Sequence, residues 1–192
     1  MLCFAPPRQL NRYTLQTPME IVEAYKDWQP SIDGRKAVAA AVSAVPKEHL
    51  IGIGRVVLTN AGGLNRAQRR KKPKHRGVTR QSREALGNYA QPWQGRAAYI
   101  NLFVDNIVAQ CPRAAKLPPI RDALFADILF HEIGHHLHVT RTKQFRERED
   151  VADDWARSLG ELYLRRRRWY LAPLIKLLGL ERTFHMRLSP RV

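Results

Sequence analysis

Two histidines four residues apart, with a glutamate directly after the first, are the residues of this chain best suited to chemistry. They are His131, Glu132 and His135, in the order HExxH. On a helix this spacing projects both imidazoles from one face, one turn apart, so both can reach a single ion. Neutral imidazoles hold Zn2+ tightly, and a catalytic site adds a third protein ligand while leaving one position for water. The motif therefore predicts a zinc site with Glu132 beside the metal.

The predicted third ligand is Glu149, which helix phase selects from several neighbouring acids. A helix from Phe145 to about Arg168 would have as its inward stripe Glu149, Ala152, Asp153, Ala156, Leu159 and Tyr163. Glu147 would lie roughly on the opposite side of that helix. The two alanines are small, so this helix could approach the His131 helix closely enough for a carboxylate to reach the metal. Asp153, one turn beyond Glu149, is placed to accept the free ring N–H of a ligand histidine and fix its tautomer.

At these residues the chain resembles the gluzincin branch of the zincin metallopeptidases. In that branch HExxH supplies two zinc ligands, and a downstream ExxxD supplies the third ligand and an aspartate behind a histidine; here ExxxD runs from Glu149 to Asp153. The segments HEIGH and EDVADDWA are most similar to small intracellular members: the minigluzincins, the ImmA/IrrE type and the M48 type. The resemblance covers about residues 97–160. The third histidine of the metzincins would fall at Arg141, so the chain does not resemble that branch.

Two further histidines and two cysteines could also bear on the metal. His138 is seven residues from His131, about 10 Å along a straight helix, which is too far for these two and His135 to bind one ion. We expect His136 and His138 to be solvated or to support the ligands. A structural zinc usually has four protein ligands, often cysteines, whereas the chain has only 2 cysteines, in no ligand spacing. The pattern therefore favours a catalytic site over a structural one.

Length and composition predict one domain spanning residues 1–192. A chain of 192 residues with 44% hydrophobic content is long enough to bury a core. The first 17 residues lack a basic region followed by an apolar run, and nowhere do about 18 apolar residues follow one another. We therefore expect neither a signal peptide nor a membrane span, and a cytoplasmic location.

The expected fold is α+β and zincin-like, with N-terminal helices, a small mixed or antiparallel sheet, the HExxH helix and a following helix with the third ligand. Residues 17–20 have the form of a capping box and predict a helix from about 18 to 28. Residues 35–45 are alanine-rich and predict a second helix. Residues 50–59 predict a first strand. Residues 97–105 alternate and predict a half-buried strand. In zincins an edge strand at this place lines the cleft and pairs with an extended substrate; an ordinary sheet strand is equally compatible with the sequence.

The HExxH helix should place the zinc site where the core borders a cleft. Residues Ile120, Leu124 and Ile128 form an apolar stripe that the two motif histidines continue. Gly134 lies inside this helix and costs about 1 kcal/mol of helix propensity relative to alanine. Its presence indicates that a neighbouring element passes close by, for which a substrate cleft or a strand is the expectation.

Positive charge is concentrated in two segments of a chain whose net charge is +16. A loop over about 60–95 contains nine basic residues and no acid between 66 and 83: Arg66, Arg69, Arg70, Lys71, Lys72, Lys74, Arg76, Arg80 and Arg83. The second segment, Arg165–Arg168, opens a helical tail from about 165 that we expect to close the core. The loop could bind nucleic acid or another acidic partner. A solvated insertion without a ligand is the alternative.

The resemblance implies zinc-dependent hydrolysis of peptide bonds in a protein or peptide substrate. Glu132 would take a proton from a zinc-bound water and pass it to the leaving amine. No oxyanion donor can be assigned: Tyr163 would lie about 21 Å along the helix from Glu149, and His185 would reach the site only if the tail folds back. The rival is a non-catalytic or DNA-associated zinc-fold regulator that acts through its basic surface. The intact Glu132 argues against it.

Overall fold

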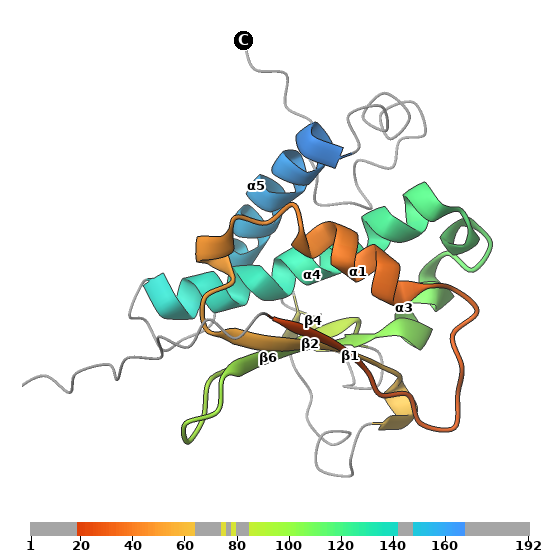
Figure 1. Cartoon of the computed structure of the whole chain (residues 1–192), viewed down its shortest axis with the longest axis horizontal. Helices are drawn as coiled ribbons and strands as arrows, with labels where there is room; N and C mark the ends of the chain where they lie inside the picture. Colours follow the sequence, from red (N-terminus) through yellow and green to blue (C-terminus); the bar gives the residue numbers. More distant parts are fainter. Residues whose placement is uncertain (1–18, 64–73, 76–77, 80–84, 142–147, 168–192) are drawn as a thin grey trace, which may run out of the picture.

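A four-stranded sheet carries helices on one of its faces in the computed structural model, which describes residues 19–63, 74–75, 78–79, 85–141 and 148–167 (Figure 1). The sheet order is β1-β2-β6-β5, where β1 is Glu20–Glu23, β2 is Ile53–Thr59, β6 is Ala98–Phe103 and β5 is Gly87–Ala90. The first three strands in this order are parallel, whereas β5 pairs antiparallel with β6. The sheet is therefore mixed, and the predicted α+β class is confirmed.

The helices of the described residues are α1 (Gly34–Val42), α3 (Val104–Gln110), α4 (Pro118–Arg141) and α5 (Glu149–Arg167). Short 3-10 turns occur at Lys47–His49, Ala61–Gly63 and Ala114–Lys116, and the two-residue strands β3 (Lys74–His75) and β4 (Val78–Thr79) form a separate pair. None of these helices is both long and apolar enough to cross a membrane.

The N-terminal part of the described chain is a strand, and the helix predicted for residues 18–28 is wrong. Ile21 and Val22 pair with Val56 and Val57 of β2 in a parallel ladder. Both residues are β-branched and suit a half-buried strand, and pairing with the sheet outweighs a local capping signal. The strand predicted first in the chain, residues 50–59, is consequently the second, and it begins at Ile53, after Gly52 with φ of 95°.

The two other predictions in this part of the fold are confirmed with changed ends. The predicted alanine-rich helix is α1, whose first turn is capped by Asp33 through the backbone N–H of Lys36 at 2.8 Å. The alternating strand is β6, in which Ile100 and Leu102 are fully buried. However, β6 lies between β2 and β5, so it is an ordinary sheet strand and not the edge strand that the resemblance to zincins implies; in the described sheet, β1 and β5 are at the edges.

The core centres on α4, which lies between the sheet and α5, with α1 beside it on the same side of the sheet (Figure 1). Phe125, Leu129 and Ile133 on this helix have no exposed surface. A Cβ added at Gly134 would lie 2.5 Å from the carbonyl oxygen of Ala152, so the element that passes close to Gly134 is α5 rather than a cleft or a strand. The close approach of two helices at small residues follows the prediction from the alanines of α5.

The inward stripe predicted for α5 is also confirmed where the structure describes it. Ala152, Ala156, Leu159 and Tyr163 are buried, and the Tyr163 ring packs edge-on against Phe130 at 5.8 Å. The helix starts at Glu149, later than predicted. Residues 142–147, most of the basic loop, and the tail from 168 lie outside the described residues, so predictions for them stay untested.

Candidate metal centre

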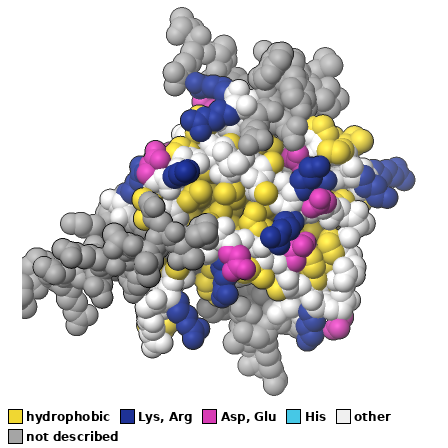
Figure 2. Space-filling view, in the orientation of Figure 1, with side chains coloured by type: hydrophobic (Ala, Val, Ile, Leu, Met, Phe, Trp, Pro, Cys, Tyr) yellow, Lys and Arg dark blue, Asp and Glu magenta, His cyan; other side chains and the backbone are white. Residues whose placement is uncertain are grey.

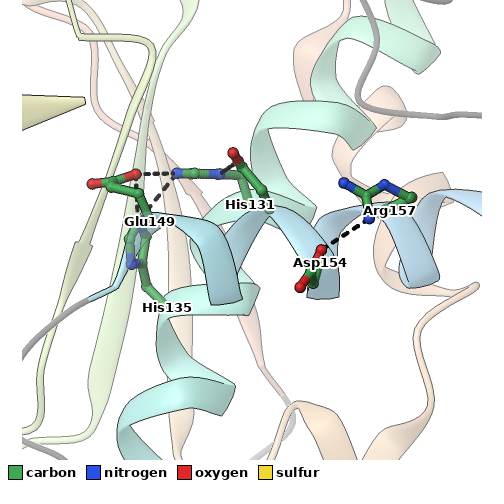
Figure 3. A network of polar contacts seen from close by, with 6 residues as sticks. His131, His135, Glu149, Asp154 and Arg157 are labelled. Carbon is green, nitrogen blue, oxygen red and sulfur yellow. Dashed lines mark hydrogen bonds and ion pairs between the residues drawn. The ribbon is translucent and has the colours of Figure 1, made fainter. Parts of the chain in front are cut away.

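Three predicted ligands come together where the first turn of α5 meets the second half of α4. His131 Nε2 and His135 Nε2 are 3.1 Å apart. Glu149 Oε2 lies 3.4 Å from the first and 3.8 Å from the second (Figure 3). Both histidines are buried, whereas the Glu149 side chain is 32% exposed. The site therefore borders solvent on the side of Glu149.

The donor geometry matches what a tetrahedral ion requires. With bonds of about 2.0–2.1 Å, two ligand atoms of a tetrahedral zinc are about 3.3 Å apart. The three separations in the structure are 3.1, 3.4 and 3.8 Å. Two imidazoles and one carboxylate are also a donor set that zinc accepts in catalytic sites. These residues therefore fit a metal ion, although other first-row divalent metals would accept the same donors.

Asp153 contacts His131, one of the three candidate ligands. His131 Nδ1 donates a hydrogen bond to Asp153 Oδ1 at 2.9 Å. In the neutral imidazole this leaves the lone pair of Nε2, the atom that faces His135 and Glu149, for a metal. Asp153 thus lies where the predicted role requires it, and the role itself stays a prediction.

The same acids alter the titration of His131 in the metal-free protein. Burial disfavours the charged imidazole, but hydrogen bonds to Asp153 and Glu149 and the charge of Glu132 outweigh burial and raise the pKa of His131 to about 10. Three carboxylates around one imidazole create a site that favours positive charge. A proton occupies this site at neutral pH until a cation replaces it.

Glu132 follows His131 on α4 and lies under the edge strand β5, and its charge acts on the His131 imidazole. Its side chain is largely buried, with 7% of the residue exposed. A Cβ added at Gly87 would lie 2.6 Å from Glu132 Oε1. Sequence reasoning missed this neighbour because β5 fell within the segment predicted to be a loop, and a strand of four residues offers too little alternation to identify.

The adjacent histidines are not solvated, so that part of the prediction is wrong. His136 and His138 are each only 1% exposed. His136 Nε2 donates to the Ile51 carbonyl at 2.9 Å, and its Nδ1 lies 3.0 Å from the Tyr89 hydroxyl. Burial lowers the pKa of His136, despite the bond to Ile51. The neutral ring therefore links α4 to β5 and to the turn before β2.

The neighbouring acids of α5 confirm the helix phase used to select Glu149. Asp150 is exposed and forms an ion pair with Arg148. Asp154 is also exposed, and Figure 3 shows it turned away from the triad toward Arg157, at 2.8 Å. Neither carboxylate joins the group of three ligand atoms. The other acid considered, Glu147, and the possible oxyanion donor His185 lie outside the described residues.

The described surface does not account for the strong positive charge of the chain. The described residues include 16 of the 33 Lys and Arg and 14 of the 17 Asp and Glu. On the face shown in Figure 2, basic and acidic side chains are interspersed. Most of the excess positive charge therefore belongs to residues outside the description, including most of the cluster at 66–83.

Comparisons with known proteins add no assignment. No protein-family model matches the chain, and neither the curated proteins nor the solved structures give a match.

Proposed function

We propose that this chain is a zinc-dependent peptidase of the gluzincin type. The observation that carries the proposal is the set of three ligand atoms, all within 4.8 Å of one another, together with Glu132 of the HExxH motif, whose charge acts on the His131 imidazole. Bound there, Zn2+ would act as a Lewis acid that makes water more acidic and polarises the scissile carbonyl. The described residues supply three ligands, and a zinc ion with three protein ligands has a position left for these reactants.

The chain's own residues then have separate tasks. Glu132 accepts a proton from water on its carboxylate and returns it to the leaving amine. Asp153 keeps a proton on His131 Nδ1, which fixes the ring with Nε2 toward the ligand group. Burial of Glu132 beneath β5 keeps bulk water away from its carboxylate, so proton transfer occurs in a restricted space.

The sheet edge next to Glu132 suits an extended peptide. β5 has one strand neighbour, β6, among the described residues, and it passes over the Glu132 side chain. An extended chain can add to such an edge through main-chain hydrogen bonds. We therefore propose β5 as the peptide-binding edge, in place of β6, the strand to which the resemblance assigned that role.

The test compares zinc-loaded wild type with Glu132→Gln on an unstructured protein substrate. The variant should retain one metal per chain and the fold but lose turnover, because an amide fills the same space and cannot accept the proton. Chelation should abolish wild-type cleavage, and added zinc should restore it. Equal cleavage by wild type and variant would contradict the assignment of Glu132. Stoichiometric zinc without any cleavage would favour the non-catalytic regulator.

A further inference from the structure

The edge strand β5 and helix α4 run side by side with two contacts in register. Gly87 lies against Glu132, and Tyr89 lies against His136. Two residues along a strand advance about 6.6 Å, and four residues along a helix advance about 6.0 Å. Both contacts therefore fit together without distortion of either element. The strand meets the helix at the motif glutamate and again one turn later.

Gly87 has no side chain, and this leaves space for the side chain of Glu132. A Cβ there would lie 2.6 Å from Oε1 and 2.9 Å from Cγ of Glu132, and 3.0 Å from a methyl group of Ile128. Even alanine would therefore displace the Glu132 side chain or push the strand away. Gly87 does not have a positive φ, so its lack of volume, rather than its backbone freedom, is what the contact requires.

At Tyr89 the distance between strand and helix is held by a buried hydrogen bond. The hydroxyl is 3.0 Å from His136 Nδ1, and the two rings meet edge-on at 5.5 Å. On its other side the His136 ring is held by the Ile51 carbonyl. Gly52, with φ of 95°, brings the turn so close that an added Cβ would lie 3.3 Å from the ring. The imidazole is thereby fixed between strand β5 and the turn before β2.

We propose that β5 positions the carboxylate of Glu132, with Gly87 leaving the space for it and the Tyr89–His136 bond setting the distance between strand and helix. Gly87, Tyr89 and His136 are positioning residues that act through Glu132. This inference rests on the proposed function, in which Glu132 transfers the proton. A displacement of about 1 Å in a catalytic group can lower a rate by about 100-fold, so a strand in direct contact with that group controls the rate.

The kinetic test is Gly87→Ala, with Glu20→Ala as the control. Glu20 is an exposed residue of β1, at the opposite edge of the described sheet. Gly87→Ala should lower kcat by about 10-fold to 100-fold, with little change in KM and unchanged zinc content. In a Glu132→Asp background the same change should cost much less, because the shorter side chain leaves room for the added Cβ. Equal losses of kcat in both backgrounds would overturn the proposal.

Tyr89→Phe tests the hydrogen bond to His136 separately from the space at Gly87, because it removes the hydroxyl and keeps the ring. It should lower kcat with unchanged zinc content and should increase amide hydrogen exchange in β5 relative to α1. Unchanged kcat together with unchanged exchange would show that the hydrogen bond does not set the distance.

A second readout does not depend on peptide hydrolysis. Gly87→Ala should lower the melting temperature more in the Glu132 protein than in the Glu132→Asp protein. Additive shifts in this cycle would show that the two residues do not oppose each other in space, which overturns the inference. A different outcome is possible: the zinc-loaded wild type does not hydrolyse peptides, but the melting-temperature shifts of Gly87→Ala and Glu132→Asp are not additive. This would overturn the proposed function and leave the contact between Gly87 and Glu132 established.

Discussion

Gly134 of the metal helix and Ala152 of α5 touch backbone to backbone: a Cβ at Gly134 would lie 2.5 Å from the Ala152 carbonyl oxygen and 2.9 Å from its Cα. This contact lies one residue before His135 and three residues after Glu149 in sequence. The approach of the two helices is therefore set at the level where the ligands meet. A ligand triad drawn from two helices depends on how closely the helices pack.

Gly134→Ala should destabilise the protein and weaken metal binding. Inside an exposed helix this change stabilises by about 1 kcal/mol, but an added methyl in a packed interface costs about 1–3 kcal/mol. Gly134→Ala is therefore expected to destabilise the protein instead of stabilising it. The melting temperature and the zinc affinity should both decrease. A higher melting temperature for the variant would show that α5 does not pack against this glycine.

Glu149→Ala should lower zinc affinity strongly, because it removes a donor atom. The loss should exceed the roughly 10-fold to 100-fold that is typical when a residue hydrogen-bonded to a metal ligand is replaced. The matched control is Asp150→Ala, which removes the next carboxylate along α5, one that is exposed and paired with Arg148. Competition with a fluorescent chelator measures both affinities. Equal losses for the two variants would mean that the acids act through general charge rather than as a ligand.

Asp153→Asn should reduce zinc affinity by about 10-fold to 100-fold. The amide can still accept from His131 Nδ1, but it lacks the charge that favours the donating tautomer. Asp154→Asn is the control, since Asp154 pairs with Arg157 on the exposed side. The affinity of the control should match that of wild type, and a comparable loss would contradict a specific role for Asp153.

The sequence predicted the residues of the site that are related by local helix periodicity, and it did not predict those brought there by contacts between distant segments. His131, His135, Glu149 and Asp153 could be selected because helix periodicity relates residues within one or two turns, and the same periodicity located the buried stripe of α5. Gly87 and Tyr89 could not be selected, because their contacts with α4 span 45 and 47 residues. Only the sheet order, in which β5 is added antiparallel beyond β6, brings them to the site.

The basic cluster at 66–83 yields a prediction that the described structure leaves untested. If it binds a polyanion, replacing Arg69, Arg70, Lys71 and Lys72 with alanine should flatten the slope of log K against log salt for duplex DNA by up to about 4 units, since each neutralised phosphate contributes about −0.9. Peptide hydrolysis should change little. Superimposable salt titrations for wild type and variant would show that these residues form a solvated insertion.

The metal-free protein should lose stability as the pH rises from about 6.5 to about 10. The pKa of His131 is raised from its ordinary value of 6.5 to about 10 in the folded state. A group whose pKa is raised by folding contributes its full stabilisation below its unfolded pKa, and this is lost as the pH rises through the folded value. Urea denaturation of chelated protein at several pH values measures the effect. Asp153→Asn should reduce this slope, because it removes the hydrogen bond to a charged acceptor.

Metal binding should depend on pH in the opposite direction, because the imidazole that binds the metal must be neutral and protons compete with the ion. Zinc affinity should therefore rise with pH over the range in which the metal-free protein becomes less stable. Binding at pH 7 should release a proton from His131, which calorimetry in two buffers of different ionisation enthalpy detects. If the apparent binding enthalpy is the same in both buffers, the His131 imidazole is already neutral before the metal binds. In that case the three carboxylates around His131 do not hold a proton at the site.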